Sequence, residues 1–254
     1  MDIDKIIESG KKFYKVAEYK GNDRFNSWKY CYDSFKDTHN RYINNKVNDL
    51  EKELDNLCLQ LSFYLASWGM YRGSSFLIWQ DYKVHYDVVK EIICNSNYNI
   101  LWNIRLEDYV NNKENCIGKL GILIDFINNH YLPIRKDVLD FLKVYKPKKY
   151  NKNENSDNNK VSDTLISKII LGTIGCVPAY DRYFIIGIRN SDNLTTTVFN
   201  GKSIQKLAKN CLSNSAFIDK FNNLKKEFLD YTEMKLIDSC FWQYGYDIDN
   251  EKNS

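Results

Sequence analysis

The chain has 254 residues, of which 43% are hydrophobic and 15% aromatic, and its formal net charge is +3. This apolar content is enough for one large core or two smaller ones, and the aromatic content excludes a disordered chain. The 3 prolines and 11 glycines are too few for the turns of an all-β protein. We therefore predict a mostly α-helical protein, built as a multi-helix globular bundle or as two helical subdomains, with a few short strands.

Targeting, cofactor and metal signals do not stand out in the sequence. The 7 cysteines are far apart and form no C-x-x-C pair, so we expect reduced thiols, no metal site and no cofactor. The N-terminus from Met1 to Lys5 lacks the pattern of a signal peptide. No stretch approaches the roughly 18 apolar residues of a membrane span. We expect a cytoplasmic protein without a membrane partner.

Residues 1–145 are predicted to form an N-terminal helical part. Apolar residues from Ile43 to Leu61 recur in steps of four and three, which predicts a long central helix over 40–67. This seam would lie either at the centre of a bundle or in a coiled-coil homodimer. The other elements predicted in this part are helices over 83–94, 115–130 and 133–145, the last with Pro133 in its first turn, and a short strand over 75–79.

Residues 146–160 are predicted to form a flexible, Lys- and Asn-rich linker. They contain five lysines and two acidic residues, a net charge of +3, and almost no apolar side chain. A C-terminal helical part over 161–250 should follow. Its predicted elements are helices over 163–172, 178–188, 203–212, 215–230 and 234–243, and a short strand over 195–199.

The first segment that could carry chemistry is SWGMYRGSSF, residues 67–76. Two glycines flank Arg72, and hydroxyl side chains follow. Glycines let the backbone approach a ligand closely, and an arginine beside exposed N–H groups suits an anion. Arg72, Gly73 and Ser74 are therefore candidate ligands of a phosphate or carboxylate. The alternative is a sharp turn whose arginine forms a salt bridge with a neighbouring helix.

The second segment is LGTIGCVPAYDRYF, residues 171–184, with the outline of a helix, a glycine hairpin and a second helix. Its residues Leu171, Ile174, Gly175 and Ala179 resemble the L-P-G-I-G-x-x-x-A pattern of helix-hairpin-helix DNA-repair glycosylases. Gly172 stands where that pattern has proline, and Thr173 where it has glycine. The resemblance implies that the hairpin around Gly172 and Gly175 holds a DNA phosphate with its N–H groups.

Isolated charges in apolar runs supply the candidate catalytic residues. They are Asp181, Lys168 and Asp238, while Arg182 is a candidate phosphate ligand. A charge in such surroundings must be paired or face a cavity. The alternatives are structural ion pairs for the carboxylates and a side chain that reaches solvent for Lys168. We expect Arg72 to lie within ion-pair range of Asp181 or Asp238, or to share a pocket with one of them.

Four segments together, SWGMYRGSSF, DYKVH, ILGTIGCVPAYDRYF and EMKLIDSCFWQYG, resemble the hallmark segments of an uncharacterised bacterial protein family. That family has no established activity, so the resemblance implies a defined fold with a defined site. The leading hypothesis is a nucleic-acid-associated helical protein of a mobile-element or phage-defence system. The alternatives are an interaction module with a protein partner or homodimer, and an enzyme or sensor for a small anionic ligand.

Overall fold

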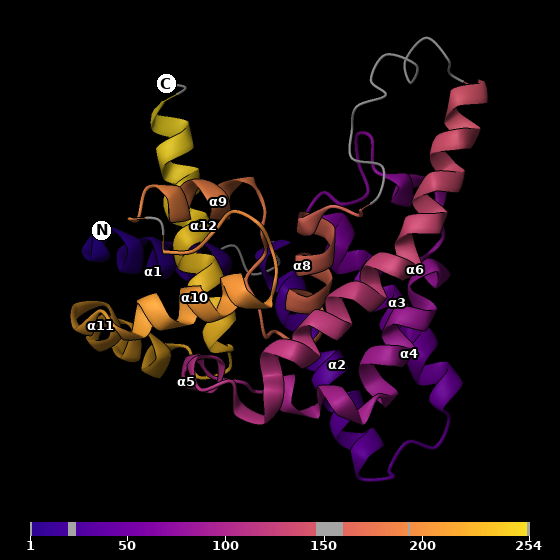
Figure 1. Ribbon diagram of the computed structural model, residues 1–254, viewed down its shortest axis with the longest axis horizontal. Helices are drawn as coiled ribbons and strands as arrows, with labels where there is room; N and C mark the ends of the chain where they lie inside the picture. Colours follow the sequence, from indigo (N-terminus) through magenta and orange to yellow (C-terminus); the bar gives the residue numbers. More distant parts are fainter. Residues whose placement is uncertain (1, 20–23, 146–159, 193, 253–254) are drawn as a thin grey trace.

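The computed structural model describes residues 2–19, 24–145, 160–192 and 194–252 (Figure 1). Every regular element within these ranges is a helix, and they contain no strand, so the predicted mostly α-helical bundle is confirmed. None of the described helices combines the length and the apolar composition that a membrane span requires. The linker predicted over 146–160 lies outside the described residues, except for Lys160.

The α-helices are, in chain order, α1 Ile3–Tyr19, α2 Ser27–Ile43, α3 Leu50–Ser67, α4 Tyr86–Cys94, α5 Leu106–Val110, α6 Cys116–Tyr145, α8 Asp163–Thr173, α9 Arg182–Arg189, α10 Gly201–Leu212, α11 Ser215–Glu227 and α12 Glu233–Glu251. Short 3-10 helices connect several of them, at Arg24–Asn26, Phe76–Trp79, Tyr82–His85, Ser96–Leu101 and Lys113–Asn115.

One continuous core joins the two predicted parts of the chain. Helix α12 packs against α1 and α9, α8 packs against α2 and α3, and α10 packs against α5 and α6 (Figure 1). The buried apolar side chains from before and after the 146–160 segment form a single cluster. The N-terminal and C-terminal parts therefore stabilise each other and do not have separate cores.

The predicted helix over 40–67 is wrong, because the chain turns between Ile43 and Leu50. Asn45 has φ +54°, a left-handed conformation that asparagine tolerates better than most residues. The Asp49 side chain then accepts a hydrogen bond from the backbone N–H of Lys52 and caps α3. The apolar seam does continue in α3, but its residues Leu54, Leu57 and Leu61 are fully buried within the chain, so they offer no homodimer surface.

Pro133 does not begin a helix, because α6 runs through it from Cys116 to Tyr145. A proline inside a helix removes one backbone hydrogen bond. Tyr131 before it and Val138 and Leu142 after it all face the same core. Burial on both sides of the proline therefore outweighs the lost hydrogen bond, and two predicted helices become one.

The C-terminal elements also differ from the prediction in detail. Pro178 lies outside regular secondary structure, and α9 begins only at Arg182, where Asp181 caps it. Helix α12 continues to Glu251, beyond the predicted end at 243. The two predicted strands are absent, because 76–79 is a 3-10 helix and 195–199 has no regular structure in the described chain.

Helices α9 and α12 touch backbone to backbone through two glycines. A Cβ atom on Gly187 would lie 2.1 Å from the carbonyl oxygen of Phe241, and one on Gly245 would lie 2.0 Å from that of Tyr183. Both distances are far below van der Waals contact, and the opposing atoms belong to the backbone, which cannot move aside alone. These two glycines therefore fix how closely α9 approaches α12.

We expect Gly245→Ala to lower the free energy of unfolding by about 3 kcal/mol, because the added methyl group overpacks a helix crossing. Gly121, in the second turn of α6, is the matched control, since a Cβ atom there meets nothing within 4 Å. Gly121→Ala should stabilise the protein by about 0.5–1 kcal/mol through reduced backbone entropy of the unfolded chain. Urea unfolding followed by circular dichroism measures both. Equal stability of the two variants would contradict the packing described here.

Candidate functional site

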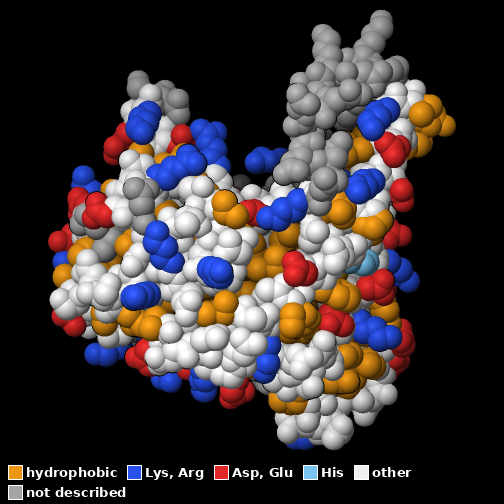
Figure 2. All heavy atoms as spheres, in the orientation of Figure 1, with side chains coloured by type: hydrophobic (Ala, Val, Ile, Leu, Met, Phe, Trp, Pro, Cys, Tyr) orange, Lys and Arg blue, Asp and Glu red, His pale blue; other side chains and the backbone are white. Residues whose placement is uncertain are grey.

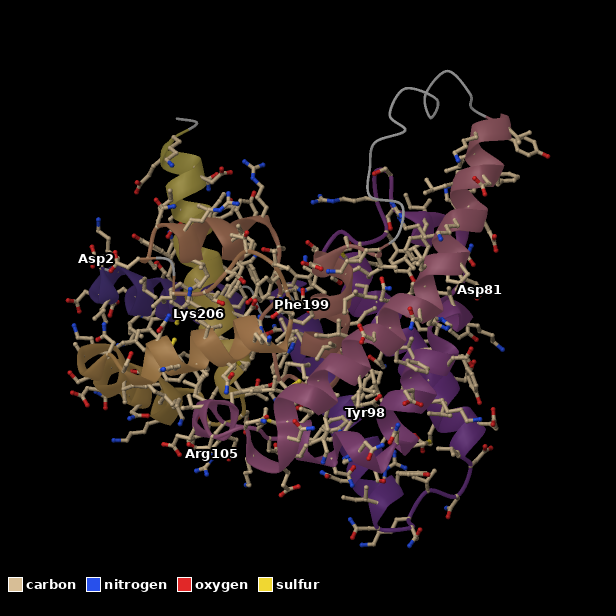
Figure 3. The ribbon with its side chains drawn as sticks, in the orientation of Figure 1. Asp2, Asp81, Tyr98, Arg105, Phe199 and Lys206 are labelled. Carbon is tan, nitrogen blue, oxygen red and sulfur yellow. The ribbon has the colours of Figure 1, made fainter. Side chains whose placement is uncertain are left out.

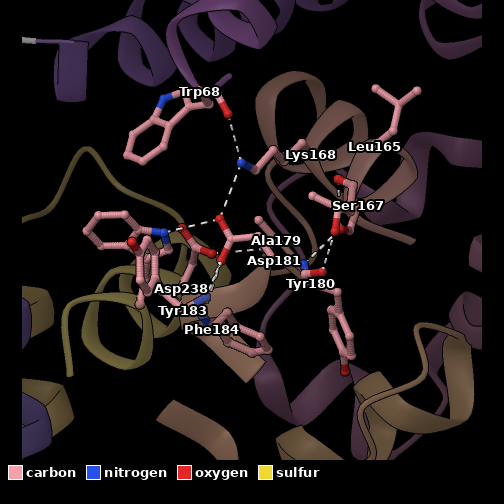
Figure 4. Close-up of polar contacts among 12 residues, drawn as sticks. Trp68, Leu165, Ser167, Lys168, Ala179, Tyr180, Asp181, Tyr183, Phe184 and Asp238 are labelled. Carbon is pink, nitrogen blue, oxygen red and sulfur yellow. Dashed lines mark hydrogen bonds and ion pairs between the residues drawn. The ribbon is translucent and has the colours of Figure 1, made fainter. Parts of the chain in front are cut away.

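The segments over 67–76 and 171–184 meet beside the Lys168 side chain of α8 (Figure 4). The Lys168 ammonium group on α8 lies 3.2 Å from the Asp181 carboxylate and donates to the backbone oxygen of Trp68, also at 3.2 Å. Trp68 belongs to the first predicted segment and Asp181 to the second. The two segments therefore lie against each other, and Lys168 is the side chain that joins them.

Asp181 holds several elements together at once. One carboxylate oxygen accepts from the N–H groups of Tyr183 and Phe184 and so caps α9. The other oxygen accepts from the indole N–H of Trp242 on α12 and faces Lys168. All of these partners come from the protein itself, so the arrangement accounts for Asp181 as a structural junction between α8, α9 and α12.

A second buried ion pair lies nearby on α12. Lys235 and Asp238 are 2.8 Å apart, and their side chains are only 3% and 5% exposed. The Lys235 ammonium group lies over the rings of Phe13, Trp28 and Trp68, at 4.9, 5.6 and 5.7 Å from their centroids. These contacts place a cation against electron-rich ring faces, which partly replaces its lost hydration.

Asp238 fixes the chain that leads into α9. One of its oxygens accepts from the backbone N–H of Ala179 at 2.9 Å. Burial raises the pKa of the Asp238 carboxyl, and Asp181 raises it further, while Lys235 opposes both effects. Candidate catalytic residues Lys168, Asp181 and Asp238 are thus all paired inside the fold, and each pair ties a turn to a helix.

Arg72 forms no ion pair with Asp181 or Asp238 and is exposed, so the expected ion pair is wrong. Its guanidinium group folds back over Gly69, where a Cβ atom would lie 2.6 Å from the arginine Nε. Gly69 and Gly73 both have positive φ, at +74° and +65°. These glycines therefore form a sharp turn, and Gly73 and Ser74 are exposed beside it.

The glycine hairpin of the second segment is buried and cannot present its N–H groups to a DNA phosphate. Gly172 lies inside α8 and leaves room for the Tyr64 ring, since a Cβ atom on this glycine would lie 2.4 Å from that ring. Gly175 has φ +72°, and its N–H donates to the carbonyl oxygen of Ile170 at the end of α8. The resemblance to a helix-hairpin-helix element therefore does not extend to an exposed phosphate site.

Arg182 is exposed but already paired. Its guanidinium group donates to both carboxylate oxygens of Asp249, each at 2.8 Å, and so joins the start of α9 to the end of α12. A phosphate would have to compete with this bidentate pair. Arg182 therefore stabilises the contact between α9 and α12, and a phosphate would bind its guanidinium group only by displacing Asp249.

His85 is a buried histidine held between two tyrosines. Its Nε2 lies 2.9 Å from the Tyr71 hydroxyl, and its Nδ1 lies 2.5 Å from the Tyr131 hydroxyl. Tyr71 in turn donates to the Ser62 hydroxyl. A neutral imidazole satisfies both tyrosines, with one N–H donor and one acceptor. Burial lowers the pKa of His85 to about 3.

A stripe of lysines on α10 is a candidate site that the sequence analysis did not identify. Lys202, Lys206 and Lys209 are exposed at successive turns of one helix face, and none of them forms an ion pair with a described residue. Lys206 is labelled on this helix in Figure 3, and Figure 2 shows basic side chains gathered over the same region. The signal was present in the sequence, since residues 193–218 contain no acidic residue.

Comparison with known proteins gives no relative from which a role could be transferred. No family model, no curated protein and no solved structure matches this chain. The resemblance to an uncharacterised bacterial family therefore stays a prediction.

Proposed function

We propose that this protein binds nucleic acid through the α10 stripe, defined as Lys202, Lys206 and Lys209. The observation that carries the proposal is the set of three exposed lysines without ionic partners among the described residues, all on one helix face. Some other surface cations of the described chain are paired, for example Lys220 with Asp4 and Lys12 with Asp247. Uncompensated cations in a row create a local positive potential that attracts a polyanion.

The spacing of the stripe suits a phosphate backbone. The three lysines are four and three residues apart, so they extend over about 10 Å of helix at 1.5 Å per residue. Along one strand of a duplex, a phosphate recurs about every 3.4 Å of helix axis. Several phosphates therefore fall within reach of three flexible ammonium groups.

The proposed contact with nucleic acid is therefore α10 and not the glycine hairpin. Lysine contacts with phosphates carry no sequence information by themselves. Binding through the stripe should therefore depend strongly on salt and little on base sequence.

The test replaces Lys202, Lys206 and Lys209 together by glutamine and measures binding to a labelled duplex by fluorescence anisotropy. Each phosphate that a lysine neutralises contributes roughly 0.9 to the slope of log affinity against log salt concentration. The triple variant should therefore flatten this slope by roughly two to three units. Its melting temperature should be unchanged, because the three side chains are exposed and form no ion pair with a described residue.

The matched control is a second triple variant that has the same change in net charge on another surface. Lys46, Lys52 and Lys136 are also exposed and have no ionic partner in the described chain, and they lie on the turn before α3, on α3 and on α6. Their replacement by glutamine should leave the salt slope nearly unchanged. Equal slopes for the two triple variants, or no binding by the wild type at low salt, would overturn the proposal.

A further inference from the structure

An open groove lies between α4 and α6, away from the α10 stripe, with a volume of about 760 Å³. Its polar side chains include Asp87, Lys90 and Glu91 from α4 and His130 from α6, and Phe126 supplies an apolar wall. The two helices are neighbours in the lower right part of the fold (Figure 1). The volume falls within the range of small-molecule sites.

The hydrogen bond of His130 determines what its ring can offer to this groove. Its Nε2 lies 2.8 Å from the carbonyl oxygen of Val84, which can only accept, so Nε2 carries the proton. In the neutral ring, Nδ1 is then an acceptor. This Nδ1 lies 3.8 Å from a carboxylate oxygen of Asp87. Two acceptors face each other across a gap that an N–H donor can bridge.

We propose that this groove binds a primary amine, and specifically a short linear diamine. One ammonium group would donate to both His130 Nδ1 and Asp87. Glu91 lies one turn further along α4, about 6 Å at four residues of 1.5 Å, which a four-carbon diamine can span. Only one Glu91 oxygen is used within the described chain, by Asn95 and Tyr98, so the other remains for the second ammonium group.

The remaining groove residues are compatible with such a ligand. Phe126 can cover the methylene chain, since its ring is only partly buried in the core. The Lys90 ammonium group, a cation that would repel the ligand, lies 6.0 Å from the centre of the Tyr86 ring. Tyr86 does not line the groove, so Lys90 has an aromatic partner outside it.

The proposal is tested by titrating the protein with 1,4-diaminobutane in low salt and following heat release by calorimetry. We expect saturable binding with one ligand per chain. Asp87→Asn should weaken it about tenfold or more, since it removes a charged hydrogen-bond partner. Butylamine, which has one ammonium group, should bind more weakly than the diamine, and Glu91→Gln should remove this difference. Asp87 is 69% exposed on its side chain, so its replacement should not disturb folding.

The matched control is Asp125→Asn, an exposed carboxylate of α6 that does not line the groove. It should bind the diamine as tightly as the wild type. In ¹⁵N spectra, the diamine should shift Nδ1 of His130, which the spectrum of a His130→Gln variant identifies among the three histidines. No saturable binding, an equal loss in Asp125→Asn, or an unmoved His130 resonance would overturn the proposal.

Discussion

Replacing Asp238 by alanine is expected to lower the free energy of unfolding by about 3–5 kcal/mol, because it leaves a buried charge without its partner. The stranded group is the Lys235 ammonium group, whose side chain is 3% exposed. The same variant also removes the acceptor for the Ala179 N–H, so the chain before α9 loses its anchor. Urea unfolding at neutral pH measures the loss.

Two further variants separate the cost of a stranded charge from a general loss of packing. In Lys235→Met/Asp238→Asn no charge remains, and the asparagine oxygen can still accept from Ala179. This double variant should recover at least half of the loss, since removal of a whole buried pair is often tolerated. Asp33→Ala breaks a solvent-accessible pair with Lys29 and should cost at most about 1 kcal/mol. A double variant as unstable as Asp238→Ala would contradict this interpretation.

Acid is expected to destabilise the protein through His85, by about 4–5 kcal/mol between pH 6.5 and pH 3. Burial lowers the pKa of His85 from 6.5 to about 3 in the folded protein. Above pH 6.5 the ring is neutral in both states, so its contribution to stability is fully present. Below pH 6.5 the unfolded chain binds a proton that the folded chain does not, and stability falls by about 1.4 kcal/mol per pH unit.

His85→Gln isolates this contribution, because the carboxylates titrate in both proteins over the same range. The difference in unfolding free energy between wild type and variant should shrink as the pH falls from 7 to 4. His39→Gln is the control, since burial lowers the pKa of His39 as well but its ring is less enclosed. The difference for His39 should change less over this range. A constant difference between wild type and His85→Gln would contradict the buried, neutral ring.

The sequence predicts helices well where an apolar face repeats and a cap precedes it. Ser162 caps α8, and the face of α3 is buried as its spacing requires. The predicted helix bounds were wrong where packing against distant residues decides whether a helix ends or continues. Asn45 can end a helix or continue it, and Pro133 can begin one or lie inside one. In both cases, the residues that pack against the helix are remote in sequence. The apolar periodicity alone therefore does not predict whether the helix ends there.

For the buried charges, the sequence identifies the residues but not their pairing. Isolated charges in apolar runs need partners, and Lys168 and Asp181 pair with each other. By sequence, Arg72 is an equally natural partner of Asp181, because both lie near glycine turns. A turn at Gly69 directs the arginine elsewhere, and no residue pattern predicts that direction. The helix positions of Lys235 and Asp238, three residues apart, do indicate that this pair can form.

The α10 stripe was missed for a different reason. Lysines at helical spacing are common on solvated faces, so the pattern alone does not distinguish a binding surface. What distinguishes these three is that they lie together on one helix face while none of them pairs with a described carboxylate, and this combination is a property of tertiary structure. Attention to the acid-free stretch over 193–218 would have indicated the same face.

The central claim, that α10 is the nucleic-acid contact, is tested most directly by lysine footprinting. The protein is acetylated briefly with and without a saturating duplex, and mass spectrometry quantifies the modification of each lysine. Lys202, Lys206 and Lys209 should be protected several-fold by the duplex, while Lys46, Lys52 and Lys136 should react equally in both samples. Protection of the second set, or unchanged reactivity of the α10 lysines in a sample where the duplex is bound, would contradict the claim.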